Sequence, residues 1–245
     1  MTMQLKWVGF DFGQCMMDPT GLRNHLVVGD VSKQLGQPEL IGQRIHKYRI
    51  LKEKYGSYSA VKEGHRDEIM SYVFDDKEEA KEIFSAKEQE HLLAGPGLEE
   101  TLQHLKSQGI QLSVVAELKK TLGAMGADIV TRFLQTKKLT KYFDEVVTPQ
   151  GKINLKDGSI NSAYKGKTKE AGTLYDELVQ DLAKRGISPS EGAMVGDKIA
   201  TDIVPAKQRG LHTIQYTGYV DMPSSEAECK ITSFLQLKEI IMKKG

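Results

Sequence analysis

Three features that would define a function class are scarce in this sequence. It has 2 cysteines, Cys15 and Cys229, without C-x-x-C spacing, so neither a disulfide framework nor a zinc site is indicated. The net charge is +1, which gives no support for binding to nucleic acid or to an acidic partner. Residues 1–6 lack a basic stretch followed by a long apolar run, so neither a signal peptide nor a membrane span is indicated. We therefore expect a cytoplasmic protein that does not bind membranes.

The remaining composition is that of a globular protein. Of the 245 residues, 39% are hydrophobic, which suffices for one large domain or for one domain with an insert. Short apolar runs alternate with amphipathic segments of helical period, and this alternation predicts an α/β protein with a parallel sheet between helices. The predicted strands are 7–10, 110–116, 143–147, 193–195 and 211–216, and the predicted helices are 98–108, 121–135, 172–185 and 235–242.

Two segments depart from the alternation. Residues 18–93 are charged, with apolar side chains at helical spacing and glycine at the breaks, and they predict a helical insert. Residues 152–164 predict a β-hairpin, because Asp157-Gly158 is a strong turn signal. The sequence leaves open whether this hairpin borders an active site or a partner surface.

Residues 195–202 combine a strand end with two carboxylates. The apolar run stops at Gly196-Asp197, and Asp202 follows where a helical pattern resumes. Two carboxylates at one strand end repel each other unless a cation lies between them, and Mg²⁺ prefers oxygen ligands. Asp202 taken alone could equally be a helix N-cap.

A second strand ends in the same way. The apolar residues 7–10 are followed directly by Asp11, then by Phe12 and Gly13. Open α/β sheets bind their ligands in the crevice outside the carboxyl ends of the strands. The recurrence of an acidic strand end therefore favours a Mg²⁺ site over a helix cap.

Four segments, in this order along the chain, resemble the motifs of the haloacid dehalogenase superfamily of Mg²⁺-dependent phosphohydrolases. Residues 10–18 (FDFGQCMMD) are similar to the first motif, hhDxDGTLxD, and the strand 109–116 takes the place of the second. Residues 169–175 (KEAGTLY) are similar to the third, often KPDPxLY, and residues 196–202 to the fourth. The resemblance spans nearly the whole chain.

The resemblance implies a Rossmann-like three-layer αβα sandwich with a parallel sheet. Residues 1–17 and 94–245 would form the core domain, and 18–93 an inserted helical cap of the C1 type. Residues 95–98 (GPGL) are similar to the point at which the family's chain re-enters the core.

The family's functional residues can be placed on this sequence by the same resemblance. Asp11 would be the nucleophile that becomes an aspartyl-phosphate, with Lys169 as its partner; Lys167 is the alternative lysine. The metal would be Mg²⁺, and the substrate would be a small phosphorylated molecule bound by a monomer or homodimer. The implied metal ligands are Asp11, the Gly13 carbonyl, Asp197 and Asp202, and the implied substrate-binding residues are Gly13, Gln14, Ala116, Glu117 and Lys169.

Two positions depart from the family pattern. Gly13 stands where the family has a second aspartate, so the backbone carbonyl is kept but the carboxyl that serves as acid and base is lost. General acid–base catalysis is typically worth about 10²–10⁴-fold, so alkyl phosphates should be poor substrates. Ala116 replaces the Ser or Thr of the second motif, and Glu117 brings a negative charge there unless it points away or pairs with Lys119 or Lys120.

Three functional hypotheses remain open. The first is a phosphatase whose acid and base come from elsewhere or whose leaving group needs little protonation. The second is a Mg²⁺- or phosphate-binding regulatory module with little turnover, and the third is a dehalogenase or phosphonate-cleaving hydrolase. The acidic pair Asp197 and Asp202 argues for phosphoryl chemistry. The candidates for a displaced proton donor are Asp18, Arg23, His25, His65 and Arg66.

Overall fold

A computed structural model describes residues 2–18, 24–56, 61–62, 64–117, 128–219 and 225–243. The chain divides into two compact units. We call Met1–Pro19 together with Ala94–Gly245 the core unit, and Thr20–Leu93 the helical unit. Within the described ranges, no helix combines the length and the apolar character needed to cross a bilayer.

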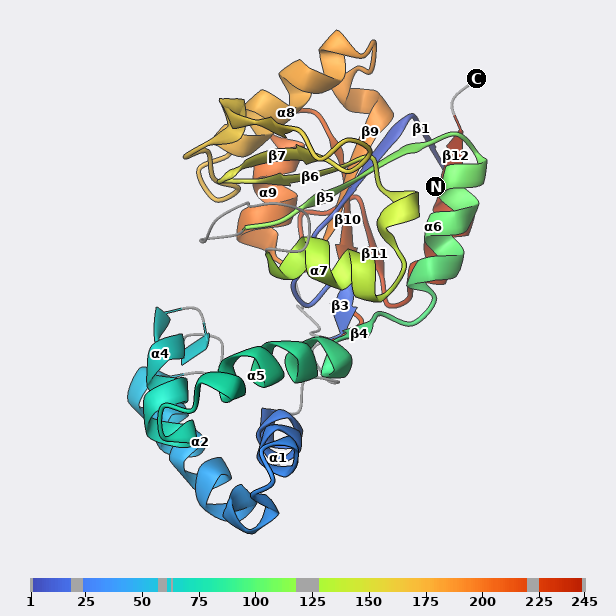
Figure 1. The fold of residues 1–245 in the computed structure, drawn as a ribbon. Helices are drawn as coiled ribbons and strands as arrows, with labels where there is room; N and C mark the ends of the chain where they lie inside the picture. Colours follow the sequence, from blue (N-terminus) through green and yellow to red (C-terminus); the bar gives the residue numbers. More distant parts are fainter. Residues whose placement is uncertain are drawn as a thin grey trace. The chain divides into compact units, whose positions relative to one another are not determined.

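The core unit is built on an eight-stranded sheet with the order β11-β10-β9-β2-β5-β6-β7-β8 (Figure 1). All neighbours from β11 to β6 are parallel, while β7 and β8 are antiparallel additions at one edge. The strands are β2 (Trp7–Phe10), β5 (Gln111–Val115), β6 (Glu145–Thr148), β7 (Gly151–Asn154), β8 (Ile160–Asn161), β9 (Gly192–Gly196), β10 (His212–Tyr216) and β11 (Cys229–Ile231).

The central strands are apolar on both faces, as a covered parallel sheet requires. Every residue of β2 and β9 is buried. Helices flank the sheet on both sides, with α8 (Thr173–Lys184) and α6 (Leu98–Ser107) on opposite sides (Figure 1). On the α8 side, Leu174, Leu178 and Leu182 share a buried cluster with Trp7 and Met194. These layers confirm the predicted Rossmann-like αβα architecture.

The remaining elements of the core unit are short. The strand β3 (Met17–Asp18) pairs with β4 (Leu93–Ala94) in a separate two-stranded sheet. The short helices are α7 (Ile129–Thr136), η4 (Thr140–Tyr142), η5 (Ser162–Tyr164), η6 (Pro189–Glu191), η7 (Ile199–Ile203) and α9 (Val204–Lys207). The predicted helix 121–135 falls partly outside the described residues, since these resume at Asp128. The Asp128 carboxylate caps α7 by accepting from Val130 N at 2.8 Å and Thr131 N at 2.9 Å.

The predicted hairpin is present as β7 and β8, and a partly buried ionic network ties it to the sheet. Lys152 on β7 pairs with Glu145 at 3.3 Å and with Asp181 on α8. The Tyr164 hydroxyl donates to Asp181 at 2.9 Å, and Arg185 Nη2 donates to Glu145 at 3.1 Å. We call these five residues the hairpin cluster; it holds the edge of the sheet against α8.

The end of the chain corrects one prediction. A single helix was expected over 235–242, but the helix there is limited to η8 (Phe234–Gln236) and α10 (Leu237–Ile240). Ile241–Lys243 forms a strand, β12, which pairs in parallel with β1 (Met3–Leu5). The Ile241 side chain is buried in this pairing, so tertiary contact overrides the local helical pattern.

The helical unit contains α1 (Asn24–Gln34), η2 (Pro38–Leu40), α2 (Ile41–Tyr55), α4 (Arg66–Glu68), η3 (Ile69–Val73) and α5 (Glu78–His91). Its helices enclose their own apolar core, which includes Val28, Tyr48, Ile69, Phe74 and Phe84. We therefore describe it as a body in its own right.

Candidate active site

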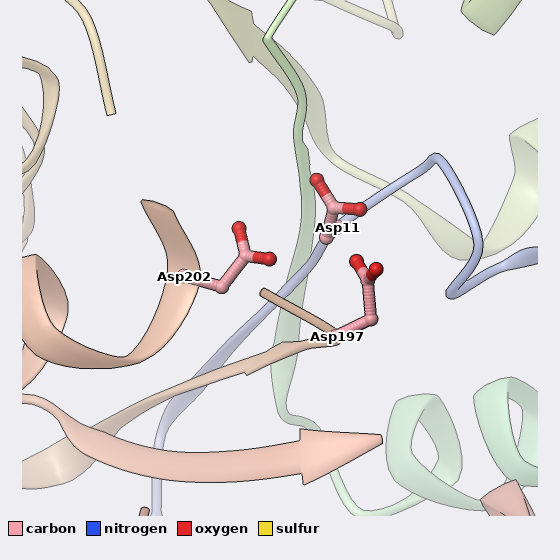
Figure 2. Close-up of side chains that lie close together, drawn as sticks. All are labelled: Asp11, Asp197 and Asp202. Carbon is pink, nitrogen blue, oxygen red and sulfur yellow. The ribbon is translucent and has the colours of Figure 1, made fainter. Parts of the chain in front are cut away.

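Three carboxylates meet at the carboxyl ends of the central strands. Asp11 directly follows β2, Asp197 directly follows β9, and these two strands pair in register with Phe10 opposite Val195. The Asp11 amide continues the ladder by donating to Val195 O at 2.8 Å. One carboxylate oxygen from each of Asp11, Asp197 and Asp202 lies within 4.8 Å of the others (Figure 2). The structure thus brings together the three acids that the sequence singles out.

Asp202 reaches this position because the chain turns sharply after β9. A Cβ at Gly196 would lie 2.4 Å from Asp202 Cβ, so only glycine permits the approach. The carboxylate accepts from Lys198 N at 3.0 Å. From α8, the buried Tyr175 hydroxyl donates to Thr201 O at 2.9 Å. The sequence analysis included Tyr175 only as the last residue of the third-motif segment 169–175 and missed this contact.

Lys169, rather than Lys167, enters the cluster. Its side chain is 1% exposed, and its ammonium donates to Asp11 Oδ1 at 2.6 Å and to Val115 O at 3.1 Å. It also forms an ion pair with Asp202. Burial alone would lower the pKa of Lys169, but the two carboxylates raise it well above its ordinary value. Lys167 pairs with Glu177 instead.

The cluster carries more negative than positive charge. Burial, and then the neighbouring Asp202, raise the pKa of Asp11 to about 7 and that of Asp197 to about 6. Asp197 Oδ1 is buried and has no hydrogen-bond partner among the residues that the structure describes. A buried oxygen of this kind normally has a partner, and hard divalent cations bind carboxylate oxygens. The donor set therefore fits a divalent cation.

The residues predicted on the phosphate side differ in environment. Gly13 is half-buried and its φ is not positive. A Cβ added at this position would have no heavy atom of the described residues within 4 Å. Gln14 is exposed and adopts a left-handed φ of 58°. Ala116 is buried at the end of β5, whereas Glu117 is exposed and its Oε2 accepts from Lys169 N at 3.0 Å. Lys119 and Lys120, the predicted alternatives for pairing with Glu117, lie outside the described residues.

The candidate proton donors are spread over both units. Asp18 lies half-buried in β3 of the core unit. In the helical unit, His25 is exposed, His65 stacks on Tyr55 with ring centroids 3.6 Å apart, and Arg66 donates to Ser85 at 2.8 Å. Arg23, the remaining candidate, is outside the described residues. These contacts of His65 and Arg66 lie within the helical unit.

Comparison with known proteins identifies the family. The family model of the haloacid dehalogenase-like hydrolases matches residues 32–216, which is more than half of the chain. The chain belongs to this family. The matched region contains Lys169, Asp197 and Asp202 and begins after Asp11. The chain is thus a haloacid dehalogenase-like hydrolase with the fold described above.

Curated relatives of this hydrolase carry phosphatase names. A Clostridium perfringens protein named "Putative pyrophosphatase PpaX" is 32% identical over 118 residues, covering 47% of this chain and 44% of that protein. The ribulose-1,5-bisphosphate 5-phosphatase of Halopiger xanaduensis is 29% identical over 133 residues, covering 54% of this chain and 44% of the relative. The matches thus span less than half of the relatives' own length.

Solved structures extend the likeness over the whole chain. The crystal structure of a HAD phosphatase from Thermococcus onnurineus superimposes with a TM-score of 0.58 at 19% identity. The superposition covers 96% of this hydrolase and 97% of that chain. At this identity the likeness shows the fold.

Proposed function

We propose that this hydrolase is a Mg²⁺-dependent phosphatase that acts on a small phosphorylated metabolite through a covalent intermediate on Asp11. One observation carries the proposal: Asp11, Asp197 and Asp202 converge within 4.8 Å, and in the described part of the chain the buried Asp197 Oδ1 has no hydrogen-bond partner. Asp11, Asp197 and the Gly13 carbonyl would hold the ion, with Asp202 at or just behind the ligand shell. The ion supplies charge neutralisation for the transferring phosphoryl group.

The reaction proposed for Asp11 has two displacements at phosphorus. In the first, a carboxylate oxygen of Asp11 forms a bond to phosphorus while the bond to the leaving oxygen breaks, which gives an aspartyl-phosphate. In the second, water attacks phosphorus, the bond to Asp11 breaks, and phosphate leaves. Lys169 opposes the rise that burial causes in the pKa of Asp11, and it orients the carboxylate through its 2.6 Å contact. Lys169, together with Gln14 and the backbone around Ala116 and Glu117, would bind the phosphate oxygens.

The leaving group sets the substrate preference. Gly13 has no side chain to protonate a departing oxygen, and the carboxyls that converge on Asp11 in the described residues, Asp197 and Asp202, are assigned to the ion. Acyl and aryl phosphates, whose leaving groups need little protonation, should therefore react faster than alkyl phosphates. The phosphatase and pyrophosphatase names of the two curated relatives support hydrolysis of phosphorylated small molecules as the reaction class. In this proposal residues 18–93 form a cap domain that influences substrate choice.

A screen of phosphate esters and anhydrides, with Mg²⁺ and with a chelator, tests the proposal. We expect turnover of acetyl phosphate and aryl phosphates that requires Mg²⁺ and is lost in Asp11→Asn. Bromide or chloride release from a 2-haloacid without metal would instead support the dehalogenase hypothesis. If no phosphorylated compound is hydrolysed by the wild type, the phosphatase proposal is wrong.

A second candidate function is favoured by the departures at Gly13 and Ala116. Without the acid and the hydroxyl that the family places there, the same cluster could bind Mg²⁺ and phosphate as a regulatory module with little turnover. Calorimetry separates the two functions. Tight binding of inorganic phosphate in the presence of Mg²⁺, together with no Asp11-dependent turnover, would support the module.

A further inference from the structure

The side chain of Glu117 engages the backbone of Lys169. Glu117 is the second residue after β5, at the position where a negative charge would oppose a bound phosphate. Its Oε2 instead accepts from Lys169 N at 3.0 Å, across 52 residues of sequence. The carboxylate is thus directed to the segment that carries Lys169.

The residues at and just after the end of β5 therefore bond both the ammonium and the backbone amide of Lys169. Val115 O accepts from the ammonium at 3.1 Å, and two residues later the Glu117 carboxylate accepts from the backbone amide. Between these two anchor points the side chain runs, 1% exposed, to Asp11 and Asp202. A long lysine side chain loses considerable rotamer freedom when it is fixed in this way. The two hydrogen bonds, from Val115 and from Glu117, restrict the positions that the Lys169 ammonium can take.

The segment around Lys169 has few other restraints from the sheet. Its turns depend on Gly166 and Gly172, both with positive φ, and Gly172 N donates back to Lys169 O at 3.0 Å. Thr168 N bonds to the Thr173 hydroxyl within the same segment. Glu117 is the side chain outside the segment that bonds the Lys169 backbone among the described residues.

We propose that Glu117 is a positioning residue for Lys169. Its carboxylate fixes the backbone at Lys169 so that the ammonium bridges Asp11 and Asp202. The Glu117 side chain would then act on the protein's own lysine, while the backbone of the same region stays available to the substrate phosphate. The inference rests on the proposed function, because it assigns Lys169 a part in the reaction.

Two substitutions separate positioning from the other roles open to a carboxylate. Glu117→Ala removes the acceptor, whereas Glu117→Gln keeps an acceptor oxygen and removes the charge. With an aryl phosphate and Mg²⁺, we expect Glu117→Ala to lower kcat about ten- to a hundredfold, the range for one hydrogen bond at a charged site, with KM changed less. Glu117→Gln should stay within about threefold of the wild type. Glu170→Ala, at an exposed glutamate of the same segment, is the matched control.

A chemical measurement on Lys169 gives a second readout that needs no turnover. Acetylation of Lys169 by acetic anhydride, followed by mass spectrometry, reports how firmly the ammonium is held. We expect a rate about tenfold higher in Glu117→Ala, and wild-type rates in Glu117→Gln and Glu170→Ala. If the wild type proves inactive, the phosphatase proposal fails, while the labelling rates still decide the role of Glu117.

Each contrary result points to a different error. If Glu117→Gln loses as much turnover as Glu117→Ala, the charge matters and Glu117 is not a positioning residue. If both variants bind inorganic phosphate more tightly than the wild type, Glu117 repels the substrate instead. If Glu117→Ala leaves turnover and labelling unchanged, the contact has no role at Lys169. Any of these outcomes overturns the proposal.

Discussion

Two groups of charged side chains in the core unit differ in how their charges are balanced: the hairpin cluster is partly buried, and the site cluster is largely buried. In the hairpin cluster, the acids Glu145 and Asp181 face the bases Lys152 and Arg185. At the strand tips, the site cluster of Asp11, Asp197 and Asp202 has Lys169 as its buried base. Counted over the described residues, the hairpin cluster has two acids and two bases, and the site cluster has three acids for one base.

The difference separates a structural network from a binding site. Removing ions from water is costly, and a buried network is stable when each charge has an opposite partner. The hairpin cluster meets this condition by itself. The site cluster does not, since the pKa of Asp11 and that of Asp197 are both raised and no described residue forms a hydrogen bond with Asp197 Oδ1. A bound cation would supply the missing positive charge.

The largest expected contrast between the clusters is in turnover. Asp11→Asn removes the nucleophile and should lower kcat at least about a thousandfold, whereas Asp181→Asn should leave kcat within a fewfold of the wild type. Steady-state rates with an aryl phosphate and Mg²⁺ measure both. Equal losses in the two variants would mean that the hairpin cluster takes part in function and that the comparison is wrong.

The next effect concerns the acid missing from the site cluster. A side chain at position 13 has open space and an ordinary φ, so Gly13→Asp should fold normally and place a carboxyl near the leaving group. We expect alkyl phosphate hydrolysis to rise about a hundredfold, within the usual range for acid–base catalysis. Gly13→Asn is the control of matched size, and an equal gain there would show that protonation is not the cause.

Replacing an aspartate by asparagine should change the free energy of unfolding in opposite directions in the two clusters. Asp181→Asn removes one of the two carboxylates that pair with Lys152 and should lower the free energy of unfolding by about 2–3 kcal/mol. Asp197→Asn should raise it by about 1–2 kcal/mol in metal-free protein above pH 6, because burial and Asp202 make the ionised form unfavourable. Urea denaturation with a chelator measures both values.

The pH dependence of Asp197→Asn follows from the raised pKa. Wild-type Asp197 is protonated in the folded and unfolded states at low pH, so the variant gains nothing there. As pH rises towards 6, the unfolded state ionises first and the wild type loses stability relative to the variant. A gain that shrank as pH increased would contradict this account.

The smallest expected effect is stabilisation by the ion itself. At ten times its Kd, Mg²⁺ should stabilise the folded state by about 1.4 kcal/mol, measured as a rise in Tm. Asp181→Asn should keep this rise and Asp197→Asn should lose it. A rise of equal size in Asp197→Asn would place the ion elsewhere.

Much of the core could be predicted from local pattern, because the strands at its centre are buried on both faces. The apolar runs at 7–10 and 193–195 identified β2 and β9, and the acids that follow them meet as expected. Because neighbouring parallel strands end at the same edge of the sheet, Asp11 and Asp197, which follow β2 and β9, lie close together. Their closeness also requires β2 and β9 to be neighbours, which the structure shows.

Other features depend on contacts between distant residues that no local pattern contains. The strand at Ile241–Lys243 exists because β1 lies beside it, and its own sequence resembles the end of a helix. The direction of Glu117 is set by the backbone of Lys169, and the choice of Lys169 over Lys167 depends on which ammonium reaches Asp11. The domain boundaries and the roles of the site residues stay predictions.

The parallel pairing of β1 with β12 determines how the core unit would resist mechanical force. β1 and β12 lie side by side (Figure 1), with Met3 opposite Ile241 and Leu5 opposite Lys243. In a parallel pair, pulling on the amino-terminal end of one strand and the carboxyl-terminal end of the other draws them apart along their length. The hydrogen bonds between β1 and β12 are then loaded together in shear, so they break together and not one after another.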